Sequence, residues 1–187
     1  MMSVGKKSVL VILAVLVVDQ ISKVWIKTHF ALGESVEITS WFHIVFIENA
    51  GMAFGLELFG KLFLTLFRIV AVGGIGYLIY RFIKQNKYPT GFIICISLIF
   101  AGALGNIIDS VFYGVIFDYA PLFHGKVVDM LYFPLFTFPE WIPFFGGHIF
   151  FSPVFNIADS AITVAVVCIL IFYRECLSEK KEKKNEA

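Results

Sequence analysis

Five aspartates stand in or beside strongly apolar segments of this chain: Asp19, Asp109, Asp118, Asp129 and Asp159. A charged side chain inside a bilayer is costly, so ionisable residues in such segments usually serve a function. Two carboxylates held close together cannot both ionise easily, and the pair then shares one proton. The ionised member can take a proton from water while the neutral member donates a hydrogen bond to a carbonyl group. These residue types therefore favour hydrolysis by an aspartate pair.

Other chemistries have weaker support. The serines near these aspartates belong to no Ser/His or Cys/His arrangement of comparable strength. The three cysteines are scattered without a CxxC motif, which favours structural thiols over disulfides or metal sites. The four histidines are equally dispersed, as is typical of loop or interface residues and not of metal ligands. We expect neither a metal nor a cofactor.

The composition predicts an integral membrane protein. Of 187 residues, 59% are hydrophobic and only 16% are charged, whereas a soluble domain has about 45–50% apolar and about 25% charged residues. Nothing in residues 1–187 separates the chain into two domains. The net charge of +1 gives no reason to expect a nucleic-acid partner. We expect one all-α membrane domain that carries a small β-rich extracytoplasmic subdomain.

Four apolar stretches are long enough to cross a hydrocarbon core, which needs about 20 helical residues. They are residues 8–27, 61–83, 90–111 and 154–173. The first resembles a cleavable signal peptide, because two lysines precede its apolar run and a small-x-small sequence follows. Charged residues between the run and that sequence, including Asp19 and Lys23, argue that the segment is retained.

The basic residues predict the orientation. Lysines and arginines cluster at the N-terminus, in the connection after residue 83 and in the tail 174–187. Because cytoplasmic segments carry the excess of such residues, we expect both termini in the cytoplasm. The outer connections are then residues 28–60 and 112–153.

These outer connections are not simple loops. Residues Val36–Thr39 and Phe42–Ile47 are rich in β-branched and aromatic side chains, which predicts two short strands. The connection 112–153 contains several prolines, which exclude another long helix. Its dense aromatic residues suit a segment at the membrane–water boundary.

Helix geometry brings most of the polar groups towards the outer leaflet. At a rise of about 1.5 Å per residue, Asp19 on the first helix lies past the midplane of the membrane. Asp129 precedes the fourth helix on the outer side. Two further pairs of polar residues are spaced three apart, so each pair should share a helix face: Asn106 with Asp109, and Asn156 with Asp159. Gly102 and Gly105 would let a neighbouring helix approach closely. The alternative is that these groups only hydrogen-bond helices together or reach towards water.

At these residues the chain resembles the signal peptidase II family of bacterial membrane aspartyl proteases. Five short motifs, in the family's order along almost the whole chain, carry the resemblance: Asp19–Lys23, Asn49–Phe54, Gly102–Asp109, Val127–Asp129 and Phe155–Ser160.

The resemblance implies a location, a substrate and a site. It implies a multi-pass protein of the bacterial inner membrane that cleaves prolipoproteins before their diacylglyceryl-modified cysteine, with the active site near the outer face. It also implies contact with membrane lipid and inhibition by globomycin-type peptides. Asp129 and Asp159 would be the catalytic pair. The supporting residues would be Asp19, Lys23, Asn49, Gly51, Asn106, Asp109 and Asn156.

Two departures from the family pattern stand out. The family usually has an arginine after the third-helix aspartate, where this chain has Ser110. We hypothesise that Arg68, which lies in the interior of the predicted span 61–83, supplies this charge by pairing with Asp109 or Asp19; the alternative is that it reaches to the membrane surface. The apolar and aromatic stretch 131–151 is also unusually long. It predicts either an insertion resting among lipid headgroups or a lid over the substrate's lipid.

Two other classes of protein fit parts of the pattern. A proton- or ion-coupled transporter also needs intramembrane carboxylates, but its site usually lies at the midplane between repeated halves, and this chain shows no repeat. A non-catalytic assembly factor would need no paired aspartate motifs.

Overall fold

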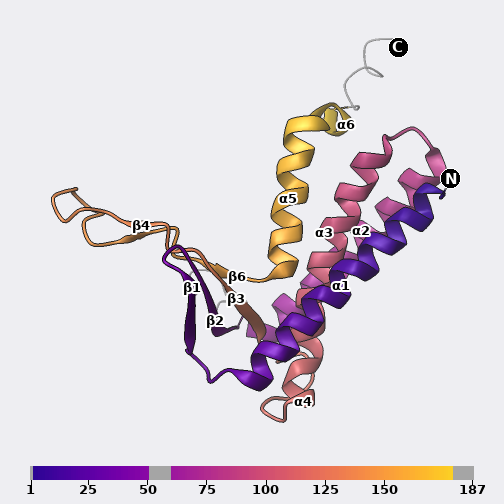
Figure 1. Ribbon diagram of the computed structural model, residues 1–187. Helices are drawn as coiled ribbons and strands as arrows, with labels where there is room; N and C mark the ends of the chain where they lie inside the picture. Colours follow the sequence, from indigo (N-terminus) through magenta and orange to yellow (C-terminus); the bar gives the residue numbers. More distant parts are fainter. Residues whose placement is uncertain (1, 51–59, 179–187) are drawn as a thin grey trace. The chain divides into compact units, whose positions relative to one another are not determined.

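The computed structural model describes residues 2–50 and 60–178 (Figure 1). The chain divides into two compact units. The first comprises Met1–Val18, Thr65–Ile107 and Ile157–Ala187, and the second comprises Asp19–Leu64 and Ile108–Asn156.

Apolar helices dominate the chain, as its composition predicts. The helices are α1 (Val4–His29), α2 (Gly60–Gln85), α3 (Thr90–Ile108), a π-helical turn η2 (Asp109–Tyr113), α4 (Gly114–Ile116), α5 (Ile157–Phe172) and α6 (Arg174–Ser178). Within the described ranges, three helical stretches are long and apolar enough to cross a membrane: α1, α2 and the continuous stretch Thr90–Ile116. The apolar helix α5 has 16 residues. It begins after the expected residue 154, because Val154 and Phe155 form a strand instead.

Close packing of α3 against α5 organises the first unit. Phe92 and Cys95 of α3 share a buried cluster with Ala165 and Ile169 of α5. Further along, a Cβ added to Gly102 would lie 2.3 Å from the carbonyl oxygen of Ala158. Only glycine permits so close an approach, which is the role that the sequence predicted for this position.

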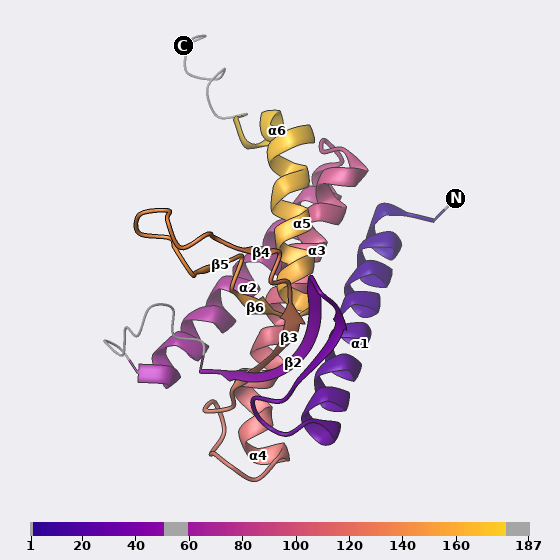
Figure 2. The ribbon, with the colours of Figure 1, turned by 60° about the vertical axis from the view of Figure 1, so that its left-hand side comes forward.

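An antiparallel sheet organises the second unit. Its strands are β1 (Ser35–Thr39), β2 (Phe42–Asn49), β3 (Val127–Tyr132) and β6 (Val154–Phe155), in the order β1-β2-β3-β6. Figure 2 shows β2 and β3 side by side. The two strands expected in residues 28–60 are confirmed, whereas β3 and β6 were not predicted. A buried cluster that includes Val128 and Met130 packs β3 onto Ile26 of α1.

A second, two-stranded sheet extends the connection between β3 and β6. Its strands are β4 (Phe136–Thr137) and β5 (Ile149–Phe150). Residues 134–153 are called the aromatic arm below. In Figure 1 the arm projects away from the four-stranded sheet.

Candidate active site

Asp129 lies on β3 and is 3% exposed. Two asparagine side chains hold its carboxylate. The Asn156 Nδ2 donates to Oδ1 at 2.7 Å, and the Asn49 Nδ2 donates to Oδ2 at 3.2 Å. Asn49 ends β2, which pairs with β3, so the sheet register brings the two residues together. Both carboxylate oxygens therefore face amide donors that can orient them.

We had expected Asn156 to lie in the first turn of the fourth helix, but it does not. It precedes α5, which begins at Ile157. The reason is that Phe155 pairs with Leu131 of β3, which keeps the chain extended up to that point. The extended backbone places the Asn156 amide against β3, where it also donates to the Val128 carbonyl at 3.3 Å. Asn156 and Asp159 consequently do not share a helix face.

Asp159 lies in the first turn of α5. The Asn106 Nδ2 of α3 donates to its Oδ1 at 2.8 Å. A helix N-terminus carries partial positive charge, which stabilises a carboxylate in the first turn. Asp159 thus has an amide donor and a favourable helix end, while the glycine at position 102 lets α3 come close enough for this hydrogen bond.

A buried ion network lies in the second unit. Lys23 Nζ contacts Asp19 Oδ2 at 2.9 Å and Asp109 Oδ2 at 2.8 Å, and all three side chains have no exposed surface. Gln20 Nε2 donates to both carboxylates at 3.0 Å. The Tyr113 hydroxyl donates to the Gln20 side-chain oxygen at 3.2 Å. One lysine therefore joins the first and third predicted spans through two carboxylates.

This network reaches the strand that carries Asp129. Asp109 Oδ2 accepts a hydrogen bond from the backbone N–H of Val128 at 3.3 Å. Because Val128 directly precedes Asp129, the ion network fixes the backbone beside the candidate catalytic carboxylate. Asp19 and Lys23 are therefore linked, through Asp109, to the strand that carries Asp129.

A second charged cluster was not predicted from the sequence. Glu48 of β2 accepts hydrogen bonds from Lys27 of α1 and, at 3.1 Å, from Lys126. The Lys27 ammonium also lies over the rings of Phe117 and Tyr119, at 4.9 and 4.6 Å from their centroids. Burial disfavours the charged carboxylate, but the two lysines outweigh it and hold the pKa of Glu48 below its ordinary value.

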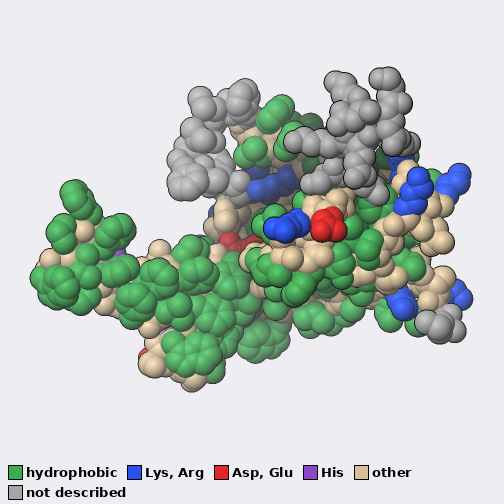
Figure 3. Space-filling model, turned by 90° about the horizontal axis from the view of Figure 1, so that it is seen from above, with side chains coloured by type: hydrophobic (Ala, Val, Ile, Leu, Met, Phe, Trp, Pro, Cys, Tyr) green, Lys and Arg blue, Asp and Glu red, His purple; other side chains and the backbone are tan. Residues whose placement is uncertain are grey.

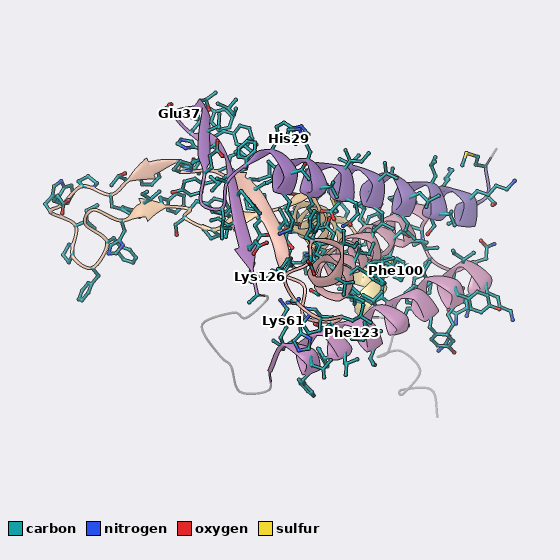
Figure 4. All side chains as sticks on the ribbon, turned by 90° about the horizontal axis from the view of Figure 1, so that it is seen from below. His29, Glu37, Lys61, Phe100, Phe123 and Lys126 are labelled. Carbon is teal, nitrogen blue, oxygen red and sulfur yellow. The ribbon has the colours of Figure 1, made fainter. Side chains whose placement is uncertain are left out.

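This cluster fixes the start of β3. Lys126, labelled in Figure 4, directly precedes the strand, and its backbone N–H donates to the Tyr119 hydroxyl at 2.7 Å. A sequence signal did exist: Lys27 follows Lys23 by four residues and therefore shares its helix face.

Three residues singled out from the sequence have not yet been placed: Gly51, Asp118 and Arg68. Gly51 lies outside the described residues. Asp118 is exposed in the turn after α4, with φ of 53°, and does not join the carboxylates described above. Arg68 is half-buried on α2, and its pairing with Asp19 or Asp109 stays a prediction.

Apolar helices, a small sheet and two aspartates held by asparagine amides, of which Asp129 is buried and Asp159 half-buried, define a membrane enzyme with carboxylate chemistry. The model of the family described as "Signal peptidase (SPase) II" matches residues 11–174. The chain therefore belongs to the signal peptidase II family, and it is a membrane protease of the aspartic type.

Individual relatives agree with this assignment. The chain is 48% identical to the lipoprotein signal peptidase of Porphyromonas gingivalis, covering 93% of this chain and 85% of the relative. It is 36% identical to that of Staphylococcus aureus, covering 95% and 93%. A solved bacterial membrane enzyme has 33% identity and a TM-score of 0.68, covering 95% of this chain and 93% of that one. The last comparison supports a membrane enzyme fold with three to four apolar helices and a small sheet.

Proposed function

We propose that this protein removes the signal peptide from diacylglyceryl-modified prolipoproteins by cleaving before the lipidated cysteine. The observation that carries the proposal is the environment of the two motif aspartates. Asp129 is held by Asn156 and Asn49, and Asp159 by Asn106. An amide donor can orient a carboxylate through a hydrogen bond, whereas the lysine beside Asp19 and Asp109 forms ion pairs with them.

In the proposed mechanism Asp129 and Asp159 act as a pair that shares one proton. The ionised carboxylate takes a proton from water, and the resulting hydroxide adds to the scissile carbonyl carbon. The protonated carboxyl donates a hydrogen bond to the carbonyl oxygen as charge develops there. A proton then passes to the leaving amine, the C–N bond breaks, and the pair regains its starting state. The products are a free signal-peptide carboxylate and a lipoprotein with an N-terminal lipidated cysteine.

The rest of the proposal concerns location and partners. The whole chain acts as one multi-pass domain of the bacterial inner membrane, with both termini cytoplasmic and the active site near the outer face. The distribution of lysine and arginine supports this orientation. Membrane lipid and globomycin-type peptides are further proposed ligands, on the family resemblance alone.

Arg68 is proposed to hold the site's outer wall by pairing with Asp19 or Asp109. On this proposal Arg68→Met lowers both activity and thermal stability, because a carboxylate loses a cation partner. Adding Ser110→Arg to that variant restores part of both. Unchanged activity and stability in Arg68→Met would exclude the pairing.

The test of the proposed function is cleavage of a diacylated prolipoprotein by the purified protein, followed as a gel shift. Asp129→Asn and Asp159→Asn should each reduce cleavage by about 10²–10⁴-fold or more, since an amide keeps the shape but cannot exchange the proton. Asp118→Asn is the matched control and should cleave normally, because this aspartate is exposed in a turn.

Folding and metal dependence are checked in the same samples. Each variant should keep its thermal unfolding midpoint in detergent to within a few degrees, and a chelator should leave wild-type cleavage unchanged. Near-normal cleavage by either asparagine variant would contradict the aspartate pair. So would a chelator-induced loss that an added metal reverses.

A further inference from the structure

The aromatic arm exposes large apolar side chains at its tip. Phe144 is 96% exposed, Trp141 80% and Phe145 57%. In Figure 3 the projection at the left carries hydrophobic side chains over almost all of its visible face. A water-exposed protein surface rarely presents a continuous apolar patch of this kind unless something covers it.

The arm also lacks the charges that a water-exposed loop normally has. Between Asp129 and Asp159 the only Asp, Glu, Lys or Arg residue is Glu140, and no Lys or Arg occurs between Lys126 and Arg174. A protein partner usually meets a polar rim with about one hydrogen bond per 100–200 Å² of interface. The arm offers few side chains that could supply such a rim, and no positive charge to attract an acidic partner.

The backbone of the arm bonds to itself. Phe138 N–H donates to the His148 carbonyl at 2.9 Å, and Gly147 N–H donates back to the Phe138 carbonyl at 3.0 Å. Within the tip, Gly146 N–H donates to the Ile142 carbonyl at 2.9 Å. Pro139 and Pro143 have no N–H to satisfy. Internal pairing of backbone groups is what a hydrocarbon environment demands, because lipid tails offer no hydrogen-bond partners.

Two glycines make this closed tip possible. A Cβ at Gly146 would lie 2.5 Å from the Glu140 carbonyl oxygen, and Gly147 has φ of 74°. Aromatic rings pack beneath the tip. Phe136 of β4 stacks on Phe150 of β5 with ring centroids 4.8 Å apart, and Phe138 contacts Phe145 with centroids 5.5 Å apart. The tip is therefore closed by its own hydrogen bonds and ring contacts, and it leaves Trp141 and Phe144 exposed.

The arm is also followed closely by an apolar helix. Its last residue, Pro153, is followed by β6 and then by the apolar helix α5 from Ile157. The end of the arm thus lies close in sequence to the start of an apolar helix, and aromatic side chains prefer the boundary region where such helices enter a membrane.

We propose that the aromatic arm inserts its tip into the lipid bilayer that holds the helices of this chain, as a non-spanning anchor. Trp141 lies in the boundary region and Phe144 reaches below the headgroups. This inference goes beyond the proposed peptidase function, and its test requires no catalysis.

The experiment measures fluorescence quenching of single-tryptophan variants in vesicles that contain brominated lipids. Trp25→Phe and Trp41→Phe leave Trp141 as the only tryptophan of the full chain. We expect blue-shifted emission, strong loss of emission with brominated lipids and weak loss with aqueous acrylamide. The water-facing control moves the tryptophan to the charged turn between α2 and α3 through Lys87→Trp and Trp141→Phe, and there acrylamide should quench and bromine should not.

A second comparison tests whether the tip carries the insertion. Phe144→Asp in the Trp141-only protein should abolish quenching by brominated lipids, whereas Phe144→Leu should preserve it. The aspartate should not unfold the arm, because Phe144 is almost fully exposed and its φ of 68° suits aspartate better than phenylalanine.

Three results would overturn the proposal. Equal acrylamide quenching at positions 141 and 87 without lipid quenching would show an arm in water. Blue-shifted emission that depends on the protein-to-lipid ratio, without lipid quenching, would show a second copy as the partner. Emission that changes only when a diacylated peptide is added would show a lid over the substrate's lipid.

Discussion

Removing the buried lysine of the ion network should strongly destabilise the protein. In Lys23→Met the side-chain volume is nearly kept, but Asp19 and Asp109 lose the ammonium that lies 2.9 and 2.8 Å away. Breaking a buried ion pair by removing one partner costs about 3–5 kcal/mol, because the remaining charge stays buried without compensation. Here two carboxylates are left, so the cost should reach the upper part of that range.

The assay is thermal unfolding of the purified protein in detergent. For a chain of this size each kcal/mol shifts the midpoint by about 2–4 °C, so a loss of about 4–5 kcal/mol lowers it by roughly 8–20 °C. Lys6→Met is the matched control on the same helix. Lys6 is exposed near the N-terminus of α1, and its replacement should change the free energy of unfolding by no more than about 0.5 kcal/mol.

A triple variant separates charge from packing. Adding Asp19→Asn and Asp109→Asn to Lys23→Met removes both uncompensated charges, and it should recover at least part of the lost stability. If Lys23→Met unfolds at the same temperature as Lys6→Met, the network does not stabilise the fold and the reasoning is wrong. If the triple variant is less stable than Lys23→Met, the loss comes from packing and not from charge.

Two further predictions follow from the glycine contact and from Glu48. Gly102→Ala should cost about 1–3 kcal/mol of stability because its Cβ would meet the Ala158 carbonyl; Gly73→Ala, where no described atom lies within 4 Å of the added Cβ, should be neutral or stabilising in the same thermal assay. Glu48 has a pKa below its ordinary value of 4.5, so its contribution to stability is complete above that pH and is lost as the pH falls through the lowered pKa. The difference in unfolding midpoint between wild type and Glu48→Gln should therefore be large at pH 7 and shrink below pH 4.5, and a difference that grows on acidification would contradict this sign.

The membrane class and the first two strands could be predicted because they depend on local patterns. Apolar stretches identify helices, and alternating β-branched and aromatic residues identify β1 and β2. By contrast, β3 forms through pairing with β2, about 80 residues earlier in the chain, as in the register of Asn49 with Val127. A motif that ends in an aspartate gives no local sign of such a partner.

Asn156 shows how a long-range contact changes the role of a single residue. Its spacing from Asp159 suggested a shared helix face, but the pairing of Phe155 with Leu131 delays the helix and turns the Asn156 amide onto Asp129. The asparagine was correctly expected at the site, while the residue that it contacts could not be deduced from helix periodicity.

Spacing on α1 explains why the second unit holds its shape around Asp129. Asp19, Lys23 and Lys27 follow one another at intervals of four, so they lie on one face over three successive turns. Lys23 pairs with Asp109, whose carboxylate accepts the Val128 N–H, and Lys27 pairs with Glu48, which lies one residue before Asn49. The same helix face thus anchors β3, which carries Asp129, and β2, which ends at Asn49. A substitution at Lys23 or Lys27 should accordingly disturb catalysis through the position of Asp129, even though neither lysine is proposed to touch the substrate.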